Sequence, residues 1–167
     1  HVNRVVTPGL GGAKIQLDQR WGTAVNSLRA IGYAMIDNVF DPAAIAAMYE
    51  YVKDKPVMYG QESGYNQVGG RAEGPLENMP AGTRFAHYKT PDLLSCPEIY
   101  QAVHNLDLIG TITAYLGAPP TVSSVSMWWS FPVDLPAAGM QMYHHDRGDF
   151  RSVNLFVYLT EVTETTG

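Results

Sequence analysis

The sequence predicts an antiparallel α+β or jelly-roll fold, because helical patterns fill its first part and strand patterns its last. Helical patterns run over residues 18–31, 41–55 and 97–117, whereas residues 121–162 are rich in β-branched and aromatic residues. The strand patterns follow one another too closely for crossover helices, which argues against a doubly wound parallel sheet. At 167 residues, with 46% hydrophobic and 16% charged residues, the chain is expected to form one globular domain.

The first helix is expected over residues 18–31, "DQRWGTAVNSLRAI". Gly32 follows it where a C-cap glycine would stand. Its apolar residues recur at helical spacing, and they are Trp21, Val25 and Leu28. The next eight residues, "YAMIDNVF" (33–40), alternate as a short strand would.

The second helix has both start signals. In "DPAAIAAMYEYVKDK" (41–55), Asp41 is the expected N-cap and Pro42 the first helical residue. One apolar face is expected, and it carries Ile45, Met48 and Val52.

Residues 56–83 are rich in glycine and interrupted by prolines, so they predict a long irregular loop. Loops of this length in compact domains often serve as binding loops or lids. The residues that would contact a substrate from such a lid are Tyr59, Tyr65, Asn66 and Arg71.

Residues 97–117 predict a helix in one or two pieces, with Gly117 as its stop. Its inward-facing residues are expected to be Ile99, Val103, Ile109, Ile112 and Leu116. Strands are then expected in residues 121–134, 140–146 and 151–162.

Charge and cysteine content exclude several classes of protein. Eleven Lys and Arg against 16 Asp and Glu give a net charge of −5, and no basic run exists, so nucleic-acid binding is not expected. The single cysteine, Cys96, excludes an intrachain disulfide framework and suits a reducing, cytoplasmic compartment. No stretch approaches 18 consecutive apolar residues, so the sequence predicts no membrane span.

The stretch "QMYHHDRGDF" (141–150) is the candidate metal site, because two histidines stand next to an aspartate in it. In a strand, residues i and i+2 share a face, so His144 and Asp146 converge while His145 points away. An imidazole and a carboxylate at this spacing form two-thirds of the two-His-one-carboxylate site of non-heme Fe(II) oxygenases. The tripeptide is short and common, so a surface or hydrogen-bonded core role is the alternative. The "RGD" at 147–149 is best interpreted as a polar turn.

The order of these pieces resembles the phytanoyl-CoA dioxygenase family of Fe(II)- and 2-oxoglutarate-dependent oxygenases. The resemblance begins at "GYAMIDNVFDPAAIAAMYEYV" and continues through "IYQAVHNLDLIGTITAYLG", "SVSMWWSFP" and "YHHD" to "SVNLFVYLTEVTETTG". It implies a double-stranded β-helix (a cupin-like jelly roll) with N-terminal helices packed on it. Residues 1–167 would be a single N-terminal portion of this domain, with the family's distal iron histidine and 2-oxoglutarate-binding arginine expected beyond Gly167.

The resemblance also assigns roles to residues. His144 and Asp146 fall on the family's iron ligands, and Lys89 falls near its basic residue for 2-oxoglutarate, with Arg84 as the alternative. An ordinary solvated lysine is an equally good interpretation of Lys89. Members with Gly or Ala at the carboxylate position halogenate, so Asp146 favours hydroxylation.

Strand alternation adds cosubstrate-binding candidates. Asn154, Phe156 and Tyr158 share one face of the last expected strand, and Ser126 and Trp128 share one face of an earlier one. Core packing is the alternative for Phe156. Trp129 and Phe131, in contrast, are expected in the core.

The function implied by the resemblance is hydroxylation of an unactivated C–H of a small organic substrate. Fe(II) would be the cofactor, and 2-oxoglutarate and O2 would be consumed, with succinate and CO2 as co-products. The alternative is a non-catalytic or isomerase-type cupin-like protein that binds a metal or small ligand. No motif selects the substrate or the oligomeric state.

Overall fold

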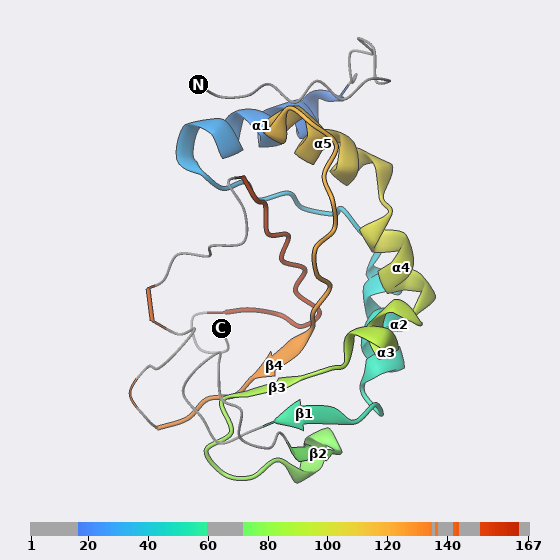
Figure 1. Cartoon of the computed structure of the whole chain (residues 1–167), viewed down its shortest axis with the longest axis vertical. Helices are drawn as coiled ribbons and strands as arrows, with labels where there is room; N and C mark the ends of the chain where they lie inside the picture. Colours follow the sequence, from blue (N-terminus) through green and yellow to red (C-terminus); the bar gives the residue numbers. More distant parts are fainter. Residues whose placement is uncertain (1–16, 60–71, 135, 137–141, 144–150, 164–167) are drawn as a thin grey trace. The chain divides into compact units, whose positions relative to one another are not determined.

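The computed structural model describes residues 17–59, 72–134, 136, 142–143 and 151–163. Its elements, in chain order, are α1 (Gln19–Ile31), α2 (Pro42–Val52), β1 (Val57–Tyr59), β2 (Ala72–Gly74), the 3-10 turn η1 (Leu76–Asn78), β3 (Phe85–His87), α3 (Thr90–Leu94), α4 (Pro97–Val103), α5 (Leu106–Leu116) and β4 (Trp128–Ser130) (Figure 1). The predicted α+β class is confirmed, with an antiparallel sheet and several helices. The jelly roll itself stays a prediction.

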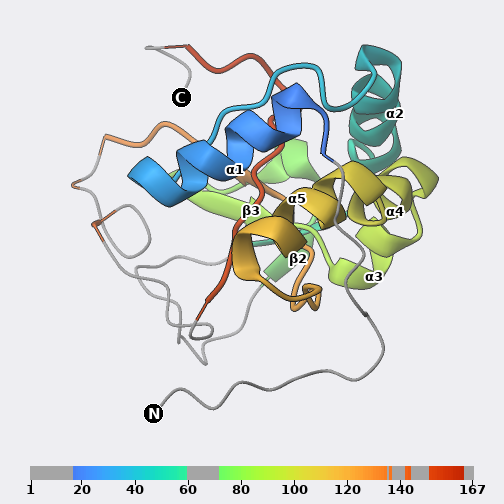
Figure 2. The ribbon, with the colours of Figure 1, turned by 90° about the horizontal axis from the view of Figure 1, so that it is seen from above.

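The chain forms two compact units, residues 1–36 with 106–120 and residues 37–105 with 121–167. In the first unit, α1 begins where expected, because the Asp18 carboxylate accepts a hydrogen bond from the Trp21 amide at 3.1 Å. Gly32 ends α1 with φ of 82°, a left-handed conformation that favours glycine. Helices α1 and α5 lie side by side (Figure 2), and the Arg29 guanidinium donates to the Ala114 carbonyl at 2.8 Å.

The expected helix over residues 97–117 consists of two pieces, with a break at His104 and Asn105. In α5 the expected inward face is wrong by a rotation about the helix axis. Leu108 and Thr111 are buried, whereas the expected Ile109, Ile112 and Leu116 are half-buried. The buried Thr111 hydroxyl is satisfied because it donates to the Asp107 carbonyl at 2.7 Å, which lets a polar residue take an inward position.

In the second unit, α2 confirms its sequence signals. The Asp41 carboxylate accepts from the Ala43 amide at 2.7 Å, and Pro42 occupies the first helical position. Of the expected apolar face, Met48 and Val52 are buried and Ile45 packs against them at the edge.

The sheet has the strand order β2-β1-β3-β4, and each neighbouring pair is antiparallel. Met58 of β1 lies opposite Glu73 of β2 on one side and His87 of β3 on the other. His87 in turn lies opposite Trp128 of β4. The prediction of an irregular loop over residues 56–83 is therefore wrong in part, because β1, β2 and η1 fall inside it. Glycine and proline content could not reveal these short strands, since their pairing is long-range.

Elsewhere the sequence predicts more strand than the described residues contain. Residues 33–40 and 151–162, which the structure describes throughout, contain no strand, and residues 121–134 contain only β4. Of the expected strand 140–146, only residues 142–143 are described, and neither is in a strand. Apolar alternation favours an extended backbone, but a strand also requires a hydrogen-bonded partner that composition does not specify.

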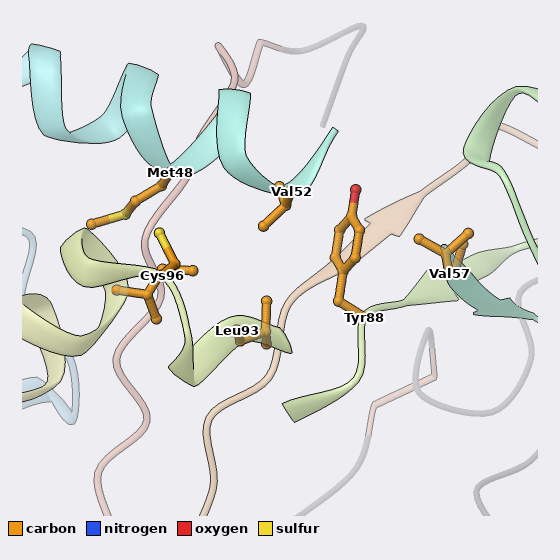
Figure 3. Packing of buried hydrophobic residues seen from close by; sticks show 8 residues of the cluster. Met48, Val52, Val57, Tyr88, Leu93 and Cys96 are labelled. Carbon is orange, nitrogen blue, oxygen red and sulfur yellow. The ribbon is translucent and has the colours of Figure 1, made fainter. Parts of the chain in front are cut away.

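One apolar cluster holds the second unit together. It joins α2, β1, β3, α3 and α4 (Figure 3), and its buried residues are Met48, Val52, Val57, Ala86, Tyr88, Leu93, Cys96 and Ile99. Half-buried residues around it include Trp129 and Phe131, as expected of core residues, and also Leu159. The sheet thus has one face turned to this core.

Leu93→Ala is expected to lower the free energy of unfolding by about 2–5 kcal/mol, the usual range for a buried leucine. Leu93 is 0% exposed at the centre of the cluster, whereas its neighbour Leu94 in the same short helix is 42% exposed. Urea unfolding followed by circular dichroism measures both variants, and Leu94→Ala is the matched control. Equal losses in the two variants would contradict this placement of α3.

Cys96 is expected to resist thiol reagents until the protein unfolds. Its side chain is fully buried, and burial raises the pKa of the thiol, so the reactive thiolate is disfavoured in the folded state. The same raised pKa means that the unfolded chain loses this proton first, so the free energy of unfolding falls as pH rises above the ordinary thiol range. Because Cys96 is the single cysteine, labelling with a chromogenic disulfide in native buffer and in urea reports on it alone. Equal rates in the two conditions would refute its burial.

Candidate functional site

The second face of the sheet, away from the apolar cluster, gathers most of the described candidate residues. We call it the open face and define it by Met58, Glu73, Phe85, His87, Lys89, Ser126, Trp128 and Ser130. Residues directly opposite in antiparallel strands share a face, as do residues i and i+2 along a strand. By the same rule Ala86 and Trp129 turn to the core, and both lie in or against the cluster.

An aromatic row runs along the open face. The rings of Phe85 and His87 have centroids 6.3 Å apart, and those of His87 and Trp128 are 6.2 Å apart. Phe156 meets Trp128 edge to face, at 6.2 Å and 86°. Trp128 and Phe156 lie on separate segments of the sequence, and the structure brings their rings together.

The aromatic row remains accessible to solvent. Trp128 is 38% exposed and Phe156 is 60% exposed. Asn154 and Tyr158, expected on the same side as Phe156, are also exposed. Core packing, the alternative for Phe156, is therefore wrong within the described part of the chain. Exposed aromatic rings next to an imidazole suit stacking against a bound ligand.

Lys89 and Ser126 continue the facing pairs of β3 and β4. The Tyr88 amide donates to the Met127 carbonyl at 3.0 Å, and the Thr90 hydroxyl donates to the Val125 carbonyl at 3.2 Å. This register sets Lys89 opposite Ser126, two residues beyond the His87 and Trp128 pair.

Arg84, the alternative to Lys89, has the opposite position in the alternation of β3. Its guanidinium donates to the Pro136 carbonyl at 2.7 Å, and its own carbonyl accepts from the Phe131 amide at 2.9 Å. Of the two basic candidates, Lys89 is thus the one that shares a face with Ser126 and Trp128.

Sequence reasoning missed Glu73. Its carboxylate forms an ion pair with the Lys89 ammonium, with 2.6 Å between Oε2 and Nζ, and each side chain is 42% exposed. Lys89 is therefore a half-exposed, ion-paired lysine. No sequence signal pointed to Glu73, because it lies in a segment expected to be a loop, and only the pairing of β2 with β1 brings it to this face.

The core side of β3 and β4 has a specific polar contact. The Trp129 indole N–H donates to the Tyr88 hydroxyl at 2.8 Å, and burial raises the pKa of Tyr88. Tyr59, expected in a substrate lid, instead lies in β1 and packs against the cluster. The other expected lid residues, Tyr65, Asn66 and Arg71, lie outside the described residues.

The expected iron ligands His144 and Asp146 also lie outside the described residues. Within the described ranges, no three His, Cys, Asp or Glu side chains group as a metal site would. The donor types nevertheless fit: an imidazole and a carboxylate suit Fe(II), and an ammonium and a hydroxyl, those of Lys89 and Ser126, suit a carboxylate ligand. Among the helices of the described residues, none is long and apolar enough to cross a membrane.

Comparison with known proteins leaves the class of the protein open. No family model, no curated protein and no solved structure matches the chain. Any functional conclusion therefore rests on the residues themselves.

Trp128→Ala and Trp129→Ala are expected to differ in their effect on stability. Trp129→Ala removes core packing and leaves the Tyr88 hydroxyl without its donor, so a loss of about 2–4 kcal/mol is expected. Trp128→Ala truncates a side chain of the open face and is expected to cost about 1 kcal/mol or less. Urea unfolding of both variants measures the difference, and a reversed order would contradict the assignment of the two faces.

Proposed function

We propose that the protein is an Fe(II)- and 2-oxoglutarate-dependent dioxygenase that hydroxylates an unactivated C–H of a small organic substrate. In this proposal the four-stranded sheet is part of a jelly roll, and the open face is its inner, ligand-binding side. His144 and Asp146 would hold the iron. When bound, Fe(II), 2-oxoglutarate and O2 would supply the oxidising chemistry, with succinate and CO2 as co-products.

The observation that supports the proposal is the grouping of Lys89, Ser126 and Trp128 on one face, with Phe156 against Trp128. The sequence predicts each of these residues, on separate segments, as a candidate for binding 2-oxoglutarate. Their meeting on one face is what a shared binding surface requires.

Each residue has a definable role in this proposal. The Lys89 ammonium would bind the carboxylate of 2-oxoglutarate remote from the metal, and the Ser126 hydroxyl opposite it would donate a second hydrogen bond. The rings of Trp128 and Phe156 would exclude water from the bound cosubstrate. Asn154 would contribute a polar group from the segment that carries Phe156.

The Glu73–Lys89 ion pair favours a second candidate function. The Glu73 carboxylate balances the charge of the Lys89 ammonium. An uncharged aromatic or apolar ligand could therefore lie on the aromatic row without an accompanying anion. This is the cupin-like alternative, in which the protein binds a metal or small ligand without oxidative turnover. Binding of 2-oxoglutarate discriminates between the two functions.

Anaerobic addition of Fe(II) and 2-oxoglutarate to the full-length protein, with the expected distal histidine and arginine present, is expected to produce a visible charge-transfer absorption band. His144→Ala removes the imidazole ligand and is expected to abolish the band, because a site that loses one ligand holds iron poorly. Absorption titration with Fe(II) measures the band in each variant.

His104→Ala is the matched control for this titration. His104 is exposed at the end of α4, with Nδ1 2.8 Å from the Tyr100 carbonyl oxygen, and has no role in the proposed site. The control should retain the band at wild-type intensity. A wild-type protein without the band, or a His144→Ala variant with an unchanged band, would exclude the dioxygenase function.

A further inference from the structure

The Lys89 side chain points toward Glu73 on β2, an edge strand of the sheet. Lys89 follows β3, and its partner Glu73 is on β2, while β1 lies between these two strands. The ammonium therefore reaches across β1, toward the edge of the sheet formed by β2. Ser126 and Trp128 are on β4, on the other side of β3. The ion pair holds the charge away from the residues with which it would bind a ligand.

We propose that Glu73 is a built-in competitor of the ligand carboxylate for Lys89. With no ligand bound, the Glu73 carboxylate holds the ammonium over β1. A dicarboxylate ligand displaces Glu73, and the ammonium turns toward Ser126 and the aromatic row. This inference rests on the proposed function, which makes Lys89 the carboxylate anchor.

The exchange is energetically easy because both partners are half-exposed. An ion pair at this level of exposure contributes little, since water screens both charges and two long side chains must be ordered. The ligand offers Lys89 the same carboxylate chemistry that Glu73 does. Once displaced, Glu73 stays near an anionic ligand and repels it, so its charge lowers affinity for dicarboxylates in both states.

Arg84 does not substitute for Lys89 in this exchange. Its guanidinium is hydrogen-bonded to the Pro136 carbonyl, and its place in the alternation of β3 is opposite to that of Lys89. The competition is therefore specific to one carboxylate and one ammonium, which allows a test with single substitutions.

The test is calorimetric titration of 2-oxoglutarate into the protein loaded with Mn(II), a metal that binds oxygen and imidazole ligands. Glu73→Gln keeps the shape of the side chain and removes its charge. It is expected to tighten binding about threefold to fivefold, the upper figure corresponding to about 1 kcal/mol. The increase should shrink at high salt, because screening weakens the competing pair.

Glu50→Gln is the matched control. Glu50 of α2 forms an exposed ion pair with Lys53, the C-cap residue of this helix, at 2.5 Å, so its substitution changes net charge equally and also removes one ion pair. Binding in this variant should equal that of the wild type. Lys89→Met should weaken binding. Adding Glu73→Gln to Lys89→Met should raise the affinity less than Glu73→Gln does in the wild type, because only the direct repulsion of the ligand by Glu73 is left to remove.

Acetylation of Lys89, followed by mass spectrometry, gives a readout without ligand. Glu73→Gln should make Lys89 react faster than in the wild type, and 2-oxoglutarate should slow the reaction in both proteins. Equal 2-oxoglutarate affinities of Glu73→Gln and Glu50→Gln, or weaker binding by Glu73→Gln, would overturn the competition and leave the proposed function standing. Absence of 2-oxoglutarate binding in both the wild type and Glu73→Gln would overturn the proposed function. If Lys89 acetylation is also unchanged in Glu73→Gln, the inference that the Glu73 carboxylate restrains the Lys89 ammonium is overturned as well.

Discussion

The pairing of β3 with β4 is the interaction on which the rest of the second unit depends. The hydrogen bond from the Tyr88 amide to the Met127 carbonyl sets the register, and the bond from the Trp129 indole to the Tyr88 hydroxyl fixes the same pair from the core side. Because β3 is also paired with β1, a shift of β4 by one residue would exchange the two faces of β4. Trp129 would then lose its core position, and Trp128 would leave the open face.

This register puts core residues and candidate ligand-binding residues on opposite faces of the same strands. On the core side, Ala86 and Tyr88 join the cluster that α2, α3 and α4 share. On the other side, the same strands present His87 and Trp128 next to Phe156. A rigid core directly beneath exposed aromatic rings is a suitable base for a binding surface, since the backbone that carries the rings is held by buried packing.

The Glu73–Lys89 pair gives this surface a balanced charge in a protein of net charge −5. A lysine is costly to leave alone beside an apolar face, and a nearby carboxylate offsets that cost. In the proposed function, the same carboxylate would compete with an anionic ligand for Lys89. The affinity for the ligand and the charge balance of the ligand-free protein would then be coupled through one ammonium group, and the weakness of the ion pair would keep the exchange easy.

The sequence by itself determined the local features of this protein: the caps of α1 and α2, the helical character of residues 97–117, and the alternation that separates Trp128 from Trp129. These depend on backbone geometry and on neighbours within a few residues, which sequence patterns report. It overestimated the strands of residues 33–40 and 151–162, and it missed β1, β2 and Glu73. Only the tertiary structure decided these, because strand pairing and the meeting of Glu73 with Lys89 or Phe156 with Trp128 join distant segments, and composition carries no record of which segments lie opposite each other.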